Sequence, residues 1–120
     1  MTKIMHVEDE PDTRKVVKEI LESEGYKITS YPNGEKGVAA VKKDKPDIIL
    51  LDVMMPGMSG WDAFERIRKV DKKAKIAFLT VLEVSPERLA VLKKAGLSDY
   101  INKPFTATEL VSRVRKMAKP

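Results

Sequence analysis

Short apolar runs recur along the chain and alternate with longer segments of helical period. The runs are rich in aliphatic and aromatic residues, as is typical of parallel strands that are buried on both faces of a sheet. They lie near residues 3–7, 26–31, 47–51, 76–80 and 99–101. The pattern therefore predicts five strands.

The segments between these runs predict five helices with clear start signals. Pro11 suits the first position of a helix, and Ser85 followed by Pro86 indicates an N-cap and a first helical residue. Thr106 followed by Glu109 fits a capping box. The second helix is expected from about Gly34 to Lys43 and the third from near Ser59, while Gly25 and Gly96 suit the ends of the first and fourth. The expected inward-facing residues are Val16, Val17, Ile20, Leu21, Val38, Val41, Trp61, Phe64, Ile67, Leu89, Leu92, Ala95, Leu110, Val111, Val114, Met117 and Ala118.

Five strand–helix units predict an α/β fold. The expected architecture is a doubly wound five-stranded parallel sheet, with helices on both faces and right-handed crossovers. The flavodoxin-like strand order 2-1-3-4-5 suits five units of this kind. In that order the first and third strands lie side by side at the switch point, which is where ligands bind.

Side chains with useful chemistry follow four of the five predicted strands. Glu8 and Asp9 follow the first, Asp52 the third, Thr80 ends the fourth, and Lys103 follows the last. Three neighbouring carboxylates repel one another unless a proton or a cation binds, and ligands that are all oxygen favour Mg²⁺. A carboxylate can also attack phosphorus, with a hydroxyl and an amine around the transferring group. The sequence therefore predicts a metal-dependent phosphate site.

Composition limits the other functional classes. The length of 120 residues suits one domain, and the absence of cysteine excludes disulfides and cysteine-based zinc sites. No apolar run approaches the roughly eighteen residues of a membrane span, and no signal peptide is evident. We therefore expect a cytoplasmic protein with no membrane partner. The net charge of +5 is the excess of 23 basic over 18 acidic residues. The basic residues are spread along the chain, so we expect solvated surface charge and no direct nucleic-acid binding.

Four motifs together resemble the receiver domain of two-component response regulators. They are Val7-Glu8-Asp9-Glu10-Pro11, Leu51-Asp52-Val53-Met54-Met55-Pro56-Gly57-Met58-Ser59-Gly60, Leu79-Thr80, and Asp99-Tyr100-Ile101-Asn102-Lys103-Pro104-Phe105. Each motif is weak alone, but they occur in the family's order and spacing over essentially the whole chain. The resemblance implies a phosphorylation-activated signalling switch, of the single-domain chemotaxis type, rather than an enzyme with a separate substrate.

The resemblance also implies a role for each matching residue. Asp52 is then the phosphoacceptor, and Mg²⁺ is held by Asp9, by Asp52, by Glu8 through water and by the backbone carbonyl of Met54. The phosphoryl group is contacted by Lys103 and, on activation, by Thr80, after which Tyr100 rotates inward. The peptide bond between Lys103 and Pro104 is expected to be cis, and residues 1–120 are expected to form the receiver domain with no output domain.

The sequence departs from the commonest family pattern around the site. Glu8 stands where Asp is more usual, and Val81 stands where a small residue is typical. Met54 and Leu82 are apolar at the two positions that, in the family, tune the attack of water on the acyl phosphate. We therefore expect slow self-dephosphorylation.

Alternatives remain for individual residues and for the whole chain. Asp52 on its own could be a turn-forming residue before Pro-Gly, and Tyr100 could be a half-buried residue of a short strand. His6 is expected to be a core residue whose ring nitrogens are hydrogen-bonded. An aspartyl-phosphate phosphatase needs a second acid two residues after the nucleophile, where this chain has Met54. A nucleotide-binding module needs a glycine-rich loop after the first strand, where this chain has Glu8 to Glu10.

The expected partners are a histidine kinase or phosphotransfer protein and a downstream protein target. The family's usual signalling face comprises the fourth helix, the fifth strand and the fifth helix, and here it would carry Arg88, Lys93, Lys94, Asp99, Tyr100, Glu109, Arg113 and Arg115. Its mixed charges suit a two-fold homodimer, although the same charges also suit a solvated surface.

Overall fold

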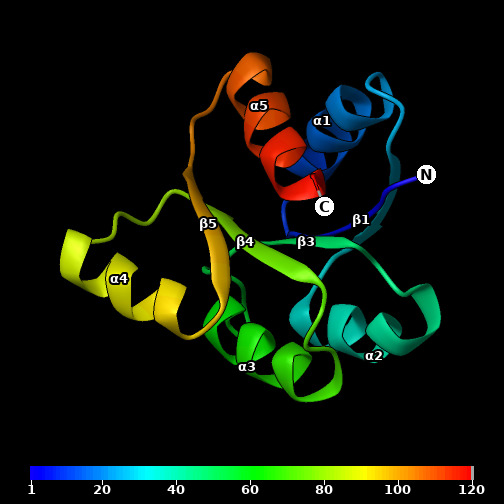
Figure 1. Cartoon of the computed structure of the whole chain (residues 1–120). Helices are drawn as coiled ribbons and strands as arrows, with labels where there is room; N and C mark the ends of the chain where they lie inside the picture. The colour runs from blue at the N-terminus through cyan, green and yellow to red at the C-terminus, as the bar shows by residue number, and fades with distance from the viewer. Residues whose placement is uncertain (120) are drawn as a thin grey trace.

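The computed structural model describes residues 1–119 and contains a five-stranded parallel sheet between two layers of helices (Figure 1). The strands are β1 (Lys3–Val7), β2 (Lys27–Tyr31), β3 (Ile48–Leu51), β4 (Lys75–Thr80) and β5 (Leu97–Asn102). The helices are α1 (Pro11–Glu22), α2 (Gly34–Asp44), α3 (Gly60–Val70), α4 (Pro86–Lys94) and α5 (Ala107–Ala118). The strand order is β2-β1-β3-β4-β5, which confirms the predicted fold class and topology.

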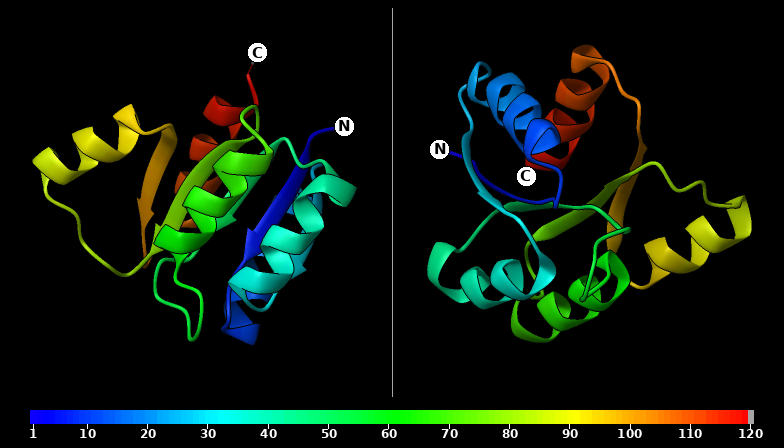
Figure 2. Two further views of the ribbon diagram at one scale, coloured as in Figure 1. Left: turned by 90° about the horizontal axis from the view of Figure 1, so that it is seen from below. Right: turned by 180° about the vertical axis from the view of Figure 1, so that it is seen from behind.

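Two hydrophobic cores lie on opposite faces of the sheet. Helices α1 and α5 cover one face, and α2, α3 and α4 cover the other (Figures 1 and 2). All four residues of β3 are buried, because this central strand is covered from both sides. The cores hold the sheet rigid and fix the positions at which its strands end.

The strands that flank the switch point end at the same level. Val7 of β1 pairs with Leu51 of β3, and the backbone N–H of Asp52 donates to the carbonyl of Val7 at 3.0 Å. The residues that follow these strands therefore emerge next to each other. This register brings Glu8 and Asp52 to one edge of the sheet.

The predicted helix caps are present. The Ser85 hydroxyl accepts from the N–H of Arg88, and the Thr106 hydroxyl accepts from the N–H of Glu109. The predicted capping box is only half formed, because the Glu109 carboxylate accepts from the Thr106 hydroxyl at 3.3 Å rather than from its backbone N–H. Gly96 follows α4 with φ +107, a conformation that suits glycine.

Two inward-facing residues were predicted wrongly. Val16 is 48% exposed. The inward-facing stripe of α1 runs through Val17 and Leu21, and Val16 lies to the side of that stripe. Ala95 is exposed because it is the C-cap of α4 and no longer follows the helical face. Strand β5 is also longer than the predicted 99–101, because Leu97 already pairs with Ile76 of β4.

Charge is segregated along the strand direction. Helices in this topology run antiparallel to the strands, so all of them begin at the carboxyl edge of the sheet. Each helix carries an acidic residue in its first turn, namely Asp12, Glu35, Asp62, Glu87 and Glu109. Four of them carry pairs of basic residues in the last turn, namely Lys42 and Lys43, Arg68 and Lys69, Lys93 and Lys94, and Arg115 and Lys116. Both arrangements complement the helix dipoles.

Candidate functional site

Three carboxylates meet at the carboxyl edge of the sheet. One oxygen each from Glu8, Asp9 and Asp52 lies within 4.8 Å of the others. Glu8 and Asp52 are buried, at 1% and 6% exposure, whereas Asp9 is exposed. The predicted acidic cluster therefore forms, and it opens to solvent on the side of Asp9.

Lys103 reaches this cluster from β5. Its ammonium group donates to Glu8 Oε1 and lies 3.5 Å from Asp52 Oδ2. Its backbone N–H donates to the carbonyl of Thr80 at 2.8 Å, and the Lys103–Pro104 peptide bond is cis. The Lys103 ammonium group, which was expected to contact a phosphoryl group, is thus hydrogen-bonded to the two buried carboxylates, Glu8 and Asp52.

The electrostatics of the cluster favour an additional cation. The pKa of Glu8 is raised to about 7: burial is the largest cause and the charge of Asp52 adds to it, whereas the hydrogen bond and charge of Lys103 act in the opposite direction. One lysine thus does not compensate three carboxylates in a partly dry site. The all-oxygen donors and the open side at Asp9 fit a Mg²⁺ ion that keeps several waters.

The backbone after β3 holds Asp52 in place. The N–H of Met54 donates to Asp52 Oδ1 at 3.1 Å, and the N–H of Gly60 donates to the carbonyl of Val53 at 2.9 Å. A Cβ atom on Gly60 would lie 2.3 Å from the carbonyl oxygen of Asp52, so only glycine fits. The start of α3 is therefore packed directly against the strand end that carries the central carboxylate.

Thr80 lies on β4, next to β3, and Tyr100 lies on β5, the strand beyond it. Thr80 is fully buried, and its hydroxyl accepts from the N–H of Leu82 at 3.2 Å. The Tyr100 hydroxyl donates to the carbonyl of Leu82 at 2.6 Å, and its ring lies edge-on to Phe78 with centroids 6.0 Å apart. Burial raises the pKa of Tyr100, so its phenol stays protonated at neutral pH. Tyr100 is thus more deeply buried than the half-buried alternative, and it already points inward.

Sequence reasoning missed two contacts near the site. The Arg14 guanidinium donates to the carbonyl of Glu8 at 2.7 Å and so holds the loop that carries the acids. The amide of Asn102 donates to the carbonyl of Leu82 at 3.0 Å. The sequence offered one indication of the second contact: Asn102 lies two residues after Tyr100, and residues two apart on a strand point to the same face of the sheet.

His6 was expected to be a satisfied core residue, and that interpretation is wrong in one respect. The side chain is fully buried, but neither ring nitrogen has a hydrogen-bond partner among the described residues. The pKa of His6 is lowered to about 3, chiefly by burial and to a smaller extent by the charges of Lys103 and Arg14. The imidazole is therefore neutral and takes no part in the acidic cluster.

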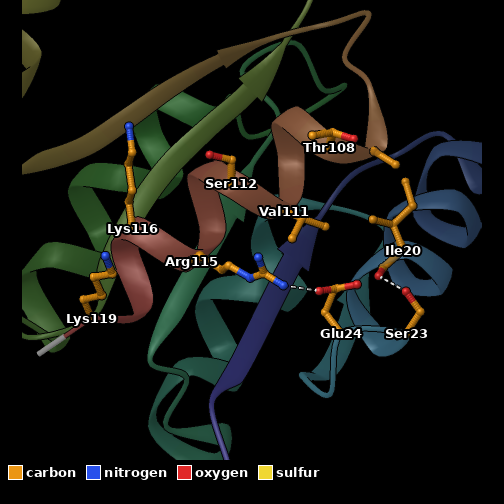
Figure 3. Close-up of a pocket in the computed structure, with 10 residues that line it drawn as sticks. Ile20, Ser23, Glu24, Thr108, Val111, Ser112, Arg115, Lys116 and Lys119 are labelled. Atoms are coloured by element: carbon orange, nitrogen blue, oxygen red, sulfur yellow. Dashed lines mark hydrogen bonds and ion pairs between the residues drawn. The ribbon is translucent and has the colours of Figure 1, made fainter.

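A groove of about 560 Å³ lies between α1 and α5, away from the acidic cluster (Figure 3). Arg115 and Glu24 form an ion pair across it at 2.6 Å. Arg115 therefore belongs to this groove and not to the signalling face on which it was expected. On that face, Arg113 pairs with Asp99 of the same chain at 2.7 Å.

Comparison with known proteins gives consistent matches. The response regulator receiver domain matches residues 4–115. The transcriptional regulatory protein YkoG of Bacillus subtilis is 38% identical over 93% of this chain and 49% of its own length, and PcoR of Escherichia coli is 36% identical over 99% of this chain and 52% of its own length. The chain thus spans about half the length of these curated relatives. Among the described residues, no helix has the length and apolar character needed to cross a membrane.

Solved structures with the same architecture cover nearly all of the chain. The response regulator TrrA of Thermotoga maritima, in complex with Mg²⁺ and BeF, has a TM-score of 0.84 at 36% identity and covers 98% of this chain and 99% of its own. A structure of the histidine kinase ThkA in complex with TrrA matches with a TM-score of 0.86 at 34% identity, covering 99% of this chain and 100% of that one. The chemotaxis protein CheY4 of Vibrio cholerae has a TM-score of 0.89 at 29% identity and covers 98% of both chains.

Proposed function

The chain belongs to the response regulator receiver domain family, and on that premise we propose that Asp52 accepts a phosphoryl group and that the domain acts as a phosphorylation-activated switch. Receiver domains of this family act in two-component signalling and are phosphorylated by histidine kinases. The observation that carries the proposal is the buried Asp52 carboxylate, set among Glu8, Asp9 and Lys103 at the carboxyl edge of the sheet.

The geometry around Asp52 suits an attacking carboxylate. The N–H of Met54 on Oδ1 and the ammonium of Lys103 near Oδ2 fix the orientation of the carboxylate plane. An Asp52 oxygen forms the new O–P bond, and the bond between phosphorus and the donor's nitrogen or oxygen breaks, with the electron pair leaving on the donor. Lys103 is close enough to move from Glu8 toward the incoming phosphoryl oxygens and to balance their charge.

Mg²⁺ is the proposed cofactor. Asp9 and Asp52 would bind the ion directly, Glu8 through water, and the Met54 carbonyl would supply a further oxygen. Bound there, the ion supplies positive charge that offsets the carboxylates and the transferring group. The solvent-exposed position of Asp9 supports this assignment, because it leaves room for the waters that Mg²⁺ retains.

The output is proposed to follow from a change at Thr80 and Tyr100. A phosphoryl oxygen on Asp52 gives the Thr80 hydroxyl a new hydrogen-bond partner in place of the Leu82 N–H. This change alters the loop that precedes α4 and so the surface formed by α4, β5 and α5. A downstream protein, or a second copy of the chain in a homodimer, would bind that surface, and the domain has no separate substrate of its own.

Intact mass spectrometry tests the proposal directly. After incubation with Mg²⁺ and acetyl phosphate, the chain should gain one phosphoryl group, and the gain should disappear with EDTA or in Asp52→Asn. Asp62→Asn is the matched control, because Asp62 is an exposed acid in the first turn of α3 outside the cluster. An adduct that persists in Asp52→Asn would refute the assignment. If no adduct forms, binding of beryllofluoride with Mg²⁺ decides whether the site is intact but closed to this donor by Val81.

A further inference from the structure

The backbone of Leu82 is held by three side chains. Leu82 lies in the loop between β4 and α4, and its N–H donates to the Thr80 hydroxyl at 3.2 Å. Its carbonyl accepts two hydrogen bonds, from the Tyr100 hydroxyl at 2.6 Å and from the Asn102 amide at 3.0 Å. The loop that joins the acidic cluster to α4 is thus anchored at one residue.

Strand geometry explains why Tyr100 and Asn102 reach the same carbonyl. Residues two apart on a strand point to the same face, and β5 places Asn102 opposite Thr80 and Tyr100 opposite Phe78. Tyr100 is buried, but Asn102 is exposed and makes no contribution to either hydrophobic core. Among the described residues, its one side-chain hydrogen bond is the one to Leu82.

The position of Tyr100 does not depend on a displaced Thr80. The expected order of events was that Thr80 moves first and Tyr100 then turns inward. Here Tyr100 is already buried at 6% exposure while the Thr80 hydroxyl still binds the Leu82 N–H. The inward position of Tyr100 thus needs no displaced Thr80, and Asn102 is the one other side chain among the described residues that donates to the same acceptor, the Leu82 carbonyl.

We propose that Asn102 is a positioning residue of the switch, which holds the Leu82 carbonyl where the inward Tyr100 hydroxyl can reach it. Because of this contact, the inward state of Tyr100 is populated before Asp52 is phosphorylated. The consequence for signalling rests on the proposed function, but the contact itself belongs to the unmodified chain.

The expected size of the effect follows from one hydrogen bond. A net intramolecular hydrogen bond changes an equilibrium by about twofold to tenfold, with a central value of about fivefold. The Asn102 amide is exposed, so water competes for it and the upper end of this range does not apply. Asn102→Ala should therefore shift the ratio of inward to outward Tyr100 about fivefold toward the outward state.

The first test measures Tyr100 in the unphosphorylated protein. The chain contains three tyrosines, so 3-fluorotyrosine labelling gives three ¹⁹F resonances, and Tyr100→Phe identifies the relevant one. Measured with EDTA and no phosphodonor, Asn102→Ala should shift this resonance toward the exposed position, and Asn102→Asp, which removes the donor, should do the same. Ser98→Ala is the matched control, because Ser98 is an exposed β5 residue whose side chain has no hydrogen bond to any of the described residues, and it should have no effect.

If nearly all molecules hold Tyr100 inward, a fivefold change in the ratio of the two states would leave the resonance almost unmoved. A double-mutant cycle tests the proposal in that case. The unfolding constant is measured for the parent, Asn102→Ala, Tyr100→Phe and the double variant. Coupling of about fivefold is expected, because Tyr100→Phe removes the hydroxyl that Asn102 helps to position. An unchanged resonance together with additive effects would overturn the proposal. Neither experiment involves phosphorylation. The role of Asn102 could therefore be confirmed even if Asp52 is not the phosphoacceptor, and Asp52 could be the phosphoacceptor even if Asn102 has no such role.

Discussion

Replacing Glu8 by Gln should stabilise the metal-free fold at alkaline pH. Glu8 is 1% exposed, and burial raises its pKa from 4.5 to about 7 in the folded chain. The folded state therefore holds this proton more tightly than the unfolded state does. The fold carries no penalty from Glu8 below about pH 4.5, loses stability as the pH rises from there, and carries the full penalty above about pH 7.

The magnitude follows from the difference between the two pKa values. At about 1.4 kcal/mol per pKa unit, the ionised Glu8 destabilises the fold by about 3 kcal/mol. Gln keeps the shape of Glu and can still accept from Lys103, and the pKa of about 7 already includes the attraction between Lys103 and the ionised Glu8. The gain for Glu8→Gln is therefore about 3 kcal/mol at pH 8, or about 12 °C in Tm for a chain of this length.

Urea and thermal unfolding in EDTA at pH 5 and pH 8 measure this gain. The stability difference between Glu8→Gln and the parent should be about 3 kcal/mol at pH 8 and about 1 kcal/mol or less at pH 5. Glu65→Gln, an exposed carboxylate on α3, is the control and should show no such dependence on pH. The burial argument is refuted if the variant is the less stable protein at pH 8, or if the difference is the same at both pH values.

Three further substitutions or measurements test other parts of the structure. Gly60→Ala should destabilise the fold by about 1–3 kcal/mol in urea unfolding, because the new Cβ would lie 2.3 Å from the Asp52 carbonyl oxygen. Gly34→Ala is the comparison: its Cβ would meet only the Met58 side chain, at 3.1 Å, and should destabilise the fold less. The phosphorylated chain should lose its phosphoryl group slowly, because the exposed apolar side chains of Met54, Val81 and Leu82 offer water no orienting polar group, and a half-life of seconds at room temperature would contradict this. Thr80→Ala should still form the adduct by intact mass but give a smaller shift of the Tyr100 resonance on phosphorylation, and an undiminished shift would exclude Thr80 from the switch.

The fold was predictable because its signals are local. Strand runs such as Ile48 to Leu51, and caps such as Ser85 before Pro86, depend on a few neighbouring residues and were confirmed. The acidic edge was predictable for the same reason, since parallel strands end at one edge. Val16 shows the limit, because two adjacent valines differ by 100° around a helix and only the packing of α1 against the sheet and α5 decides which one is buried.

Contacts between distant side chains could not be predicted from the sequence. The hydrogen bonds of Lys103 to Glu8 and of Arg14 to the Glu8 carbonyl depend on rotamers within a closed site. Nothing in the local sequence distinguishes a buried histidine that has a hydrogen-bond partner from one such as His6, which has none in the part of the chain that the structure describes. The fold topology placed these residues near one another, and side-chain packing then selected the pairs.

The molecule is also an electric dipole about 30 Å long. Its negative pole is the edge that carries Asp52 and the acidic first turns, and its positive pole is the opposite end with the basic last turns. A dipole turns in the field of a charged partner before contact, so a kinase with a basic docking surface would meet the reactive edge first. Salt screens such fields over about 8–10 Å, so raising the ionic strength should weaken this orientation and leave the chemical step unchanged. Phosphorylation adds negative charge at the same pole, and the orienting torque on the molecule is then greater than before the reaction.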